Sequence, residues 1–378
     1  MSPRKKVSSI VFNNFTNDSR VLKEAISLSK NGYTVDIIAH LDKGLPKEQK
    51  LQENVVVKRV SYLDRTSAST LTKIKAYLKF LRESIAIAKK SDIVHCNDLN
   101  AMPVAFVLKR FYNKNIKIVY DAHEYETQMN HFSERTRKIM YFFEKRLIKY
   151  ADAVITVSDS IANEYVRLYP KITKPSLVLN CPSFKEVEKK DKFRERFGIP
   201  KEATIFLYQG SLTSGRGLEI IIEAFEKTTK KDNVLVMMGY GNLEKFAQKK
   251  AQQHSNIYFH EAVSPNVLLD YTSSADFGIA TIENTCLSYY YCLPNKMFEY
   301  IMAGVPVIVS DLPEMKKVVT TYNIGVVAKE NSSDGILKAI EQASQLDLNL
   351  MKENLNKAKE VFNWQKQEDV LVKTYTNL

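Results

Sequence analysis

The segment from Leu293 to Asp311, LPNKMFEYIMAGVPVIVSD, combines residues that could bind an anion and a sugar. Pro294, followed by Asn295 and Lys296, predicts the start of a helix, because proline is favoured in a first helical turn. The free amides of that turn and the helix dipole form an anion site, to which Lys296 adds a positive charge. Glu299 follows one turn later on the same face, where its carboxylate can accept hydrogen bonds from the hydroxyl pair of a ribose. The alternative is a Lys296–Glu299 pair on a solvated helix.

A glycine-rich turn predicts a second anion-binding element between Tyr208 and Phe225, YQGSLTSGRGLEIIIEAF. A strand-like run ends at Gly210, a loop places Arg216 beside Gly217, and a helical pattern follows. Glycines let the backbone approach a ligand closely, and an arginine between them can bind a diphosphate with two parallel hydrogen bonds. The alternative is a plain strand-to-helix turn with an exposed arginine.

Another glycine pair, Gly239 and Gly241, ends a further strand-like run. The dinucleotide-binding fingerprint requires a third glycine near position 244, where this chain has Glu244. The pair is therefore weak support for NAD or FAD binding, although a dinucleotide-dependent oxidoreductase stays open as an alternative.

The elements that must position these residues alternate between strand and helix. The strand-like runs of the N-terminal half are 7–12, 35–39, 55–59, 93–96, 116–120, 153–157 and 176–179, and those of the C-terminal half are 205–209, 234–238, 257–259, 277–280, 307–310 and 326–328. The polar segment Asn180–Lys190 between them indicates an interdomain linker. Near-continuous apolar strands between amphipathic helices predict parallel sheets covered on both faces. Two such arrays predict two doubly wound α/β domains with a cleft between them.

The order of the motifs resembles that of a GT-B glycosyltransferase and, within that fold, the retaining family called GT4 or glycosyltransferase group 1. In the C-terminal half the order is the Arg216–Gly217 turn, Gly239-x-Gly241, the phrase SADFGIA, and Glu299 before AGVPVIVSD. NDSRVLKEAISLSKNGYTVDIIA, DIVHCNDL and YDAHEY match in the N-terminal half, and the final NWQKQEDVLVKTY resembles a helix that crosses back to that half. The resemblance implies two Rossmann-like domains that face each other: residues 1–182, completed by 362–378, for the acceptor, and residues 183–361 for the nucleotide-sugar donor.

The resemblance also implies roles for individual residues. Glu299 matches the second glutamate of the family's paired-glutamate motif and would hold the donor ribose, while Arg216 and Lys296 would hold the diphosphate. His123 matches a cleft histidine that contacts the donor sugar or the acceptor. The residues expected at the donor are Gly210, Arg216, Gly217, Gly239, Gly241, Pro294, Asn295, Lys296 and Glu299, those expected at the acceptor or cleft are Asp18, Arg20, His95, Asp98 and His123, and those expected to act in catalysis are His123, Arg216, Lys296 and Glu299. Asp18 and Arg20 would lie in the first strand-to-helix loop.

Two positions depart from the family's pattern. Tyr291 stands where the family has its first glutamate, and Ser211 stands where many relatives carry another phosphate-binding arginine. Glu283 or Asn284 could substitute if the intervening loop folds back. The departures keep open a catalytically silent sugar-nucleotide-binding subunit of a transferase complex. A sugar-nucleotide epimerase or a phosphorylase of the same fold is a further alternative, but the extra acid/base residues and the cofactor lysine that these need are not identifiable.

Three polar residues of the N-terminal half have simpler alternatives. His95 ends a strand and could be a packed or capping histidine, and Asp18 could only cap the first helix. His123 lies near Asp121, Glu124 and Glu126, a set that suggests a metal. We reject a metal, because no second histidine stands at ligand spacing. No cofactor is expected.

The resemblance implies a metal-independent reaction in which the acceptor attacks on the face that the diphosphate leaves, so that configuration is retained. Positive side chains and a helix terminus would replace the divalent cation of other transferases. The donor is expected to be a UDP-sugar, with a GDP-sugar possible, and the acceptor a glycan, a glycolipid or a cell-wall polysaccharide.

The net charge of +12 also calls for an anionic partner. Nucleic acid is not expected, because no zinc knuckle, RNA-binding aromatic run or helix-turn-helix pattern appears. Residues 71–90 and 133–150 instead predict basic amphipathic helices, which can lie on anionic lipid and would suit a lipid-linked acceptor. The alternative is a pair of solvated helices with buried apolar stripes. With no signal peptide, no apolar run of about 18 residues and four scattered cysteines, the sequence favours a cytoplasmic protein. Contact of the basic helices with lipid would make it peripheral on the inner face of the cytoplasmic membrane.

Overall fold

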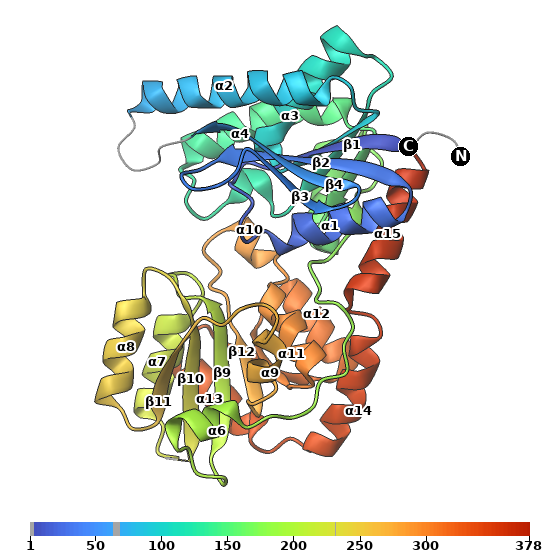
Figure 1. Cartoon of the computed structure of the whole chain (residues 1–378). Helices are drawn as coiled ribbons and strands as arrows, with labels where there is room; N and C mark the ends of the chain where they lie inside the picture. Colours follow the sequence, from blue (N-terminus) through green and yellow to red (C-terminus); the bar gives the residue numbers. More distant parts are fainter. Residues whose placement is uncertain (1–3, 63–68, 231) are drawn as a thin grey trace. The chain divides into compact units, whose positions relative to one another are not determined.

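The computed structural model describes residues 4–62, 69–230 and 232–378, which form two compact units (Figure 1). Unit 1 comprises residues 4–178 and 368–378, and unit 2 comprises residues 179–367, within the described ranges. Each unit is a sheet with helices on both faces, and its strands are parallel except for one edge strand of unit 1, the arrangement that near-continuous apolar strands require.

Unit 1 is built on an eight-stranded sheet in the order β3-β4-β2-β1-β5-β6-β7-β8. Its strands are β1 (Lys5–Ile10), β2 (Tyr33–Leu41), β3 (Glu48–Gln52), β4 (Val55–Tyr62), β5 (Ile93–Asn97), β6 (Lys117–Ala122), β7 (Ala153–Thr156) and β8 (Ser176–Leu177). Its helices are α1 (Ser19–Lys30), α2 (Thr70–Ala88), α3 (Met102–Val107), α4 (Glu134–Leu147) and α5 (Asp159–Leu168), with short turns η1 (Leu99–Ala101), η2 (Leu108–Tyr112), η3 (Glu126–Gln128) and η4 (Ile148–Tyr150). Strand β3 pairs antiparallel with β4 and was not predicted, because its exposed polar residues show no apolar alternation.

Unit 2 is built on a six-stranded parallel sheet in the order β11-β10-β9-β12-β13-β14. Its strands are β9 (Thr204–Ser211), β10 (Asn233–Tyr240), β11 (Ile257–Glu261), β12 (Phe277–Ala280), β13 (Val307–Ser310) and β14 (Gly325–Ala328). Its helices are α6 (Lys192–Phe197), α7 (Leu218–Lys227), α8 (Glu244–Gln253), α9 (Leu268–Thr272), α10 (Leu287–Tyr290), α11 (Asn295–Ala303), α12 (Pro313–Tyr322), α13 (Ser333–Ala343) and α14 (Leu348–Lys359). Alternate residues of β9 enter two cores, Ile205 and Leu207 on one face and Phe206 and Tyr208 on the other.

The last helix, α15 (Trp364–Thr376), begins in unit 2 and continues into unit 1. Asn363 separates it from α14: its amide donates to the carbonyl of Lys359 (2.7 Å) and its side-chain oxygen accepts from the amide of Lys366 (3.0 Å). The same side chain thus ends one helix and starts the next. The predicted contact of the C-terminal helix with the N-terminal domain is made by Thr374, whose hydroxyl lies 2.9 Å from that of Ser176.

No helix among residues 4–62, 69–230 and 232–378 has the length and apolar character needed to cross a membrane.

Candidate active site

The loop that carries Arg216 in unit 2 is fixed by its glycines. Gly217 adopts φ 74° just before α7, and a Cβ there would lie 2.5 Å from the hydroxyl oxygen of Thr281. A side chain is therefore excluded both by conformation and by space. Glu283 fastens the same loop, because its carboxylate accepts from the amide of Gly217 (3.2 Å) and its amide donates to the carbonyl of Gly215 (3.0 Å).

The second glycine pair supports this loop from the neighbouring strand. A Cβ on Gly239 would lie 1.9 Å from the carbonyl oxygen of Gly210, and one on Gly241 would lie 2.4 Å from that of Leu212. The two glycines let β10 run directly against the end of β9. The structure thus gives both of them a packing reason, whether or not a ligand also approaches.

Arg216 is half-buried, with its guanidinium carbon 4.8 Å above the ring of Tyr289. The ring orients the charge, since guanidinium groups stack well on aromatic faces. Ser211 is exposed, and its hydroxyl lies 3.2 Å from that of Thr213.

Lys296 is the second residue of α11 and is buried, although it is a lysine. Its ammonium nitrogen lies 3.5 Å from the ring centroid of Tyr208 and has no hydrogen-bond partner among the described residues. Burial, and secondly the charge of Arg216, lowers the pKa of Lys296 to about 7, against a smaller opposing effect of Glu299. A buried amine without a hydrogen-bond partner is costly, and an incoming anion would remove that cost.

The start of α11 lies beside this amine. Pro294 directly precedes the helix, so the predicted start is displaced by one residue, and the exposed Asn295 is its first residue. The first amides of a helix have no partner within it, so they add partial positive charge next to Lys296.

Glu299 lies one turn further along α11 and is half-buried. Its carboxylate accepts a hydrogen bond from the side-chain amide of Gln209, whose own oxygen accepts from the hydroxyl of Thr272 (2.8 Å). Tyr300 fixes the adjoining backbone, because its hydroxyl donates to the carbonyl of Leu207 and accepts from the amide of Gln209. Glu299 is therefore held at the end of β9, next to the loop of Arg216. A Lys296–Glu299 pair on a solvated helix does not describe these residues, because Lys296 is buried.

The positions expected to replace the missing first glutamate differ in their surroundings. Glu283 is engaged with the Arg216 loop, as described above, and Asn284 is exposed. Tyr291 is half-buried, with its ring centroid 5.1 Å from that of Tyr290.

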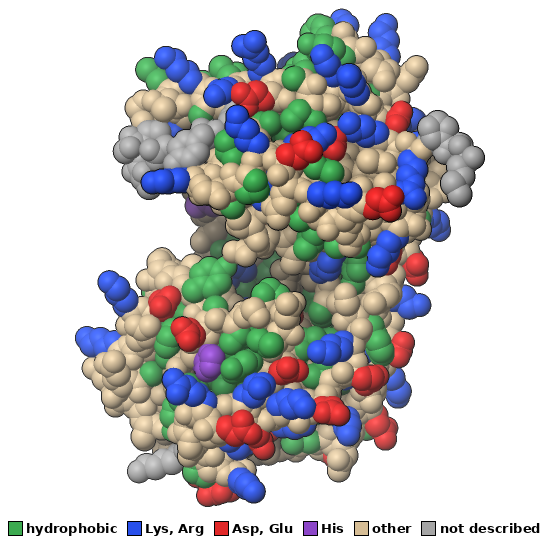
Figure 2. All heavy atoms as spheres, viewed as in Figure 1, with side chains coloured by type: hydrophobic (Ala, Val, Ile, Leu, Met, Phe, Trp, Pro, Cys, Tyr) green, Lys and Arg blue, Asp and Glu red, His purple; other side chains and the backbone are tan. Residues whose placement is uncertain are grey.

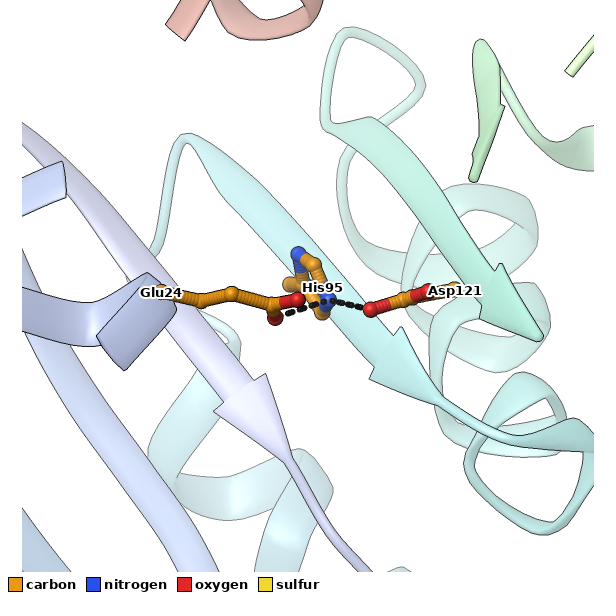
Figure 3. A group of neighbouring side chains, drawn as sticks. All are labelled: Glu24, His95 and Asp121. Atoms are coloured by element: carbon orange, nitrogen blue, oxygen red, sulfur yellow. Dashed lines mark ion pairs between the residues drawn. The ribbon is translucent and has the colours of Figure 1, made fainter. Parts of the chain in front are cut away.

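In unit 1 the centre of the polar residues is Asp121, at the C-terminal end of β6 and fully buried (Figure 3). Arg20 binds its carboxylate with both Nη2 (2.8 Å) and Nε (3.2 Å), and donates from Nη1 to the carbonyl of Val178 (2.7 Å). Burial by itself would raise the pKa of Asp121, but Arg20 and then His123 outweigh it and hold that pKa well below its usual range.

His95 and Glu24 lie against the same carboxylate (Figure 3). The Nε2 atom of His95 is 3.4 Å from Asp121 and 3.5 Å from Glu24, and its Nδ1 is 2.7 Å from the hydroxyl of Tyr375 in α15. His95 is buried, which corresponds to the alternative of a packed histidine. Burial, and secondly Asp121, raises the pKa of Glu24 to about 7.

His123 follows β6 directly and is the more exposed end of this group, with 19% of its side chain accessible. Its Nε2 lies 3.2 Å from Asp121, while its Nδ1 is 3.6 Å from Asp98. Burial by itself lowers the pKa of His123, but Asp98 and Asp121 outweigh it and raise the pKa to about 9. Asp98 also accepts from the backbone amide of His123, and it does so with φ 63°, ψ 167°, a strained conformation for a residue with a side chain.

Two expectations for the first helix change. Arg20 is inside α1 rather than in the preceding loop, and its guanidinium is paired with the buried carboxylates of Asp121 and Glu24. Asp18 caps α1 by accepting from the amide of Val21 (3.1 Å), and its other oxygen accepts from Asn13 (2.8 Å). The capping alternative for Asp18 is therefore what the structure shows.

Three of the buried side chains could in principle hold a metal ion, because ligand atoms of Glu24, His95 and Asp121 lie within 4.8 Å of one another. The guanidinium of Arg20 lies 3.1 Å from Glu24 and 2.8 Å from Asp121. The positive charge that a metal would supply is thus already present, and a dication beside it would be repelled. The group fits an ion-pair network better than a metal site.

Several contributors were not predicted from the sequence. Glu24 stands four residues after Arg20 on the same helix face, and Tyr208 stands two residues before Gly210 on the same strand face. These spacings were readable signals. Gln209 and Tyr375 carried none, because their roles depend on which distant strand or helix end lies beside them.

The fold is that of a GT-B glycosyltransferase. Sucrose-phosphate synthase from Thermosynechococcus elongatus superposes with a TM-score of 0.82 at 18% identity, covering 99% of this chain and 98% of that one. HepE from Anabaena, solved in complex with UDP-glucose, superposes with a TM-score of 0.75 at 13% identity, covering 99% and 100%.

Sequence comparison narrows the class. The family model for glycosyl transferases group 1 matches residues 189–361, and that for glycosyltransferase family 4 matches residues 19–180. An uncharacterized glycosyltransferase of Methanocaldococcus jannaschii is 23% identical over 334 residues, 84% of this chain and 82% of that protein. The O-antigen biosynthesis glycosyltransferase WclY of Escherichia coli is 22% identical over 249 residues, 60% of this chain and 62% of that protein. The chain belongs to the group 1, or GT4, glycosyltransferases and is a transferase of glycosyl groups.

Proposed function

We propose that this glycosyltransferase moves a sugar, with retention of configuration and without a metal, from a UDP-sugar to the growing glycan or lipid-linked acceptor of a cell-surface polysaccharide. The UDP-glucose complex of a protein with the same fold supports the donor, and the O-antigen relative supports the acceptor. A GDP-sugar remains the second candidate for the donor.

The observation that carries the proposal is the buried ammonium of Lys296, which has no hydrogen-bond partner in the part of the chain that the structure describes. In the proposed complex the donor diphosphate accepts hydrogen bonds from Lys296, Arg216 and the first amides of α11. These groups are fixed before the substrate arrives, so they stabilise the negative charge of the leaving diphosphate as it develops. Glu299, held by Gln209 at the end of β9, accepts from the ribose hydroxyls.

Retention follows if the acceptor hydroxyl attacks on the face that the diphosphate leaves. A phosphate oxygen of the leaving group takes the proton of that hydroxyl, while the bond from the anomeric carbon to the phosphate oxygen breaks. No enzymatic nucleophile is then needed. His123 of unit 1 is proposed to donate a hydrogen bond to the sugar or the acceptor, because its neighbours Asp98 and Asp121 favour its charged form.

A membrane surface is the proposed location of the acceptor. Leu71, Ile74 and Leu78 of α2 are 50–70% exposed, so the described residues do not cover the apolar stripe in the first half of this helix. On α4, Ile139, Phe142 and Phe143 are 46–52% exposed. Figure 2 shows Lys and Arg side chains interspersed with hydrophobic ones over α2, along the upper edge of the view. Exposed apolar side chains among cations suit an anionic bilayer.

A silent nucleotide-binding subunit is the competing proposal, favoured by Tyr291 and Ser211 in place of the family's glutamate and arginine. Such a subunit would bind the sugar nucleotide at the same donor site as the proposed transferase, but it would not turn the donor over.

The test is a panel of UDP-, GDP-, CDP- and ADP-sugars in EDTA, read out by thermal shift and by donor hydrolysis, with Glu299→Ala and Arg216→Ala beside the wild type. We expect one nucleotide family to stabilise the wild type but neither variant, with slow hydrolysis that EDTA does not affect. Stabilisation without hydrolysis, or without transfer to any acceptor extract, would favour the silent subunit. If no sugar nucleotide binds, the proposed function is wrong.

A further inference from the structure

Several buried polar groups behind His123 have no part in the mechanism proposed above. His95 lies between Glu24 and Asp121 (Figure 3). On either side of these three, Tyr375 contacts His95 and His123 contacts Asp121. The side chains of Glu24 and His95 are at most 3% exposed, so neither can touch a substrate directly. They connect the C-terminal helix to the histidine that is proposed to act in transfer.

This arrangement is energetically costly, because several of its buried polar atoms make no hydrogen bond. Both carboxylate oxygens of Glu24, and Nε2 of His95, have no hydrogen-bond partner among the described residues. Arg20 lies 3.1 Å from Glu24, but its Nε–H is directed at Asp121, so that contact is ionic only. A leucine or methionine would fill this space without the desolvation cost. A buried acid that packing does not require points to a role in setting the charge around it.

We propose that Glu24 and His95 are positioning residues of this transferase, which, with Tyr375 of α15, set the orientation and charge of His123 through Asp121. The proposal depends on the proposed function only in giving His123 a part in transfer.

The hydroxyl of Tyr375 determines where His95 carries its proton. When the phenol donates to Nδ1, the proton of the neutral imidazole is on Nε2, between the carboxylates of Glu24 and Asp121. The proton there attracts the two acids electrostatically, without a hydrogen bond to either, and this favours the position of the Asp121 oxygen that faces His123. The carboxylate of Glu24, when ionised, also favours the charged form of His123, since the two groups interact electrostatically.

The charged and titratable groups that face this set come from every adjoining element. They are Arg20 and Glu24 of α1, His95 of β5, Asp98 after β5, Asp121 of β6, His123 after β6, Tyr375 of α15 with its neighbours Tyr33 and Cys96, and Glu126, which faces Asp98. Two substitutions change one group of this set at a time. Glu24→Gln removes a single charge and nearly keeps the shape of the side chain, and Tyr375→Phe removes a single hydroxyl.

The experiment is a titration of the six histidines by ¹⁵N NMR in the full, unliganded chain. We expect Glu24→Gln to lower the titration midpoint of His123 by roughly 0.5–1 pH unit, because a negative neighbour is lost. Tyr375→Phe should change the ¹⁵N tautomer signature of His95 and shift the His123 midpoint. Tyr33→Phe is the matched control: its ring packs edge-on against Tyr375 (5.4 Å), and it should change neither. Where Glu24→Gln lowers the yield of folded protein, Tyr375→Phe carries the test.

A second readout separates positioning from general damage to the fold. In both test variants the UDP affinity of unit 2 should equal that of the wild type, while donor hydrolysis falls several-fold and its pH profile moves with the His123 midpoint. If His123 titrates alike in all four proteins, the proposal is overturned. The titration needs no donor, so it stands even if no sugar nucleotide binds and the proposed function fails.

Discussion

The buried cations of the two units have opposite surroundings. In unit 1 the guanidinium of Arg20 is paired with two buried carboxylates. In unit 2 the ammonium of Lys296 lies over the ring of Tyr208 and has no hydrogen-bond partner among the described residues. A satisfied ion pair holds a structure together, but an unsatisfied cation costs stability until an anion arrives. The difference supports the proposal that unit 2 receives the diphosphate, whereas the charges of unit 1 pair with its own residues.

The largest expected effect is on the stability of unit 1. Arg20→Met leaves Asp121 and Glu24 buried without their cation, which should lower the free energy of unfolding by about 3–5 kcal/mol. Urea denaturation measures it, with Arg167→Met on the surface of α5 as the control, where an exposed pair should cost less than about 1 kcal/mol. An equal effect of the two substitutions would contradict the paired role of Arg20.

Replacing the buried cation of unit 2 by methionine should have a different effect on stability. Lys296→Met removes a buried cation without a hydrogen-bond partner, so the free energy of unfolding should stay the same or rise. UDP affinity should fall roughly 10–100-fold, because a charged hydrogen bond to the diphosphate is lost. Calorimetry measures the UDP affinity of Lys296→Met and of the control variant Lys245→Met, which changes an exposed lysine of α8. If the Lys296→Met variant were less stable than the wild type and bound UDP equally well, Lys296 would serve the fold and not the diphosphate.

Affinity for the donor should also depend on pH in one direction. The pKa of Lys296 is lowered to about 7, so the free protein loses this charge as pH rises above 7. Binding that requires the ammonium should then weaken, by at most about tenfold per pH unit. UDP-glucose is the probe, because its diphosphate does not titrate between pH 6.5 and 9 on the scale of this effect. Lys296→Arg keeps its charge over this pH range, so its affinity should depend less on pH than that of the wild type. If affinity fell equally with pH in both proteins, the titration of Lys296 would not be the cause.

The smallest expected effect concerns the exposed apolar side chains. Phe142→Ser with Phe143→Ser should reduce binding to vesicles of anionic phospholipid by roughly five- to tenfold, because partly buried aromatic surface is lost. Leu348→Ser with Leu350→Ser, equally exposed on unit 2, is the control and should have no effect. Co-sedimentation at two salt concentrations measures both. No difference between the two double variants would argue against a membrane-facing α4.

The sequence predicted the sheets better than it predicted the polar contacts. Alternation of apolar strands with helices fixed the fold class, because burial on both faces leaves a direct pattern in β9 and β13. Proline and glycine spacing placed Lys296 and Arg216 at the ends of elements. The pairing of Arg20 with Asp121 could not be predicted, since 101 positions separate them and only the sheet order brings α1 next to β6. The cap made by Asp18 is local, and it was among the alternatives that the sequence offered.

The most direct test of the central claim is a crystal structure of the full chain with UDP. The account predicts the diphosphate within hydrogen-bonding distance of Lys296 and Arg216, and the ribose on the carboxylate of Glu299. A diphosphate bound elsewhere, with the ammonium of Lys296 still directed only at Tyr208, would contradict it.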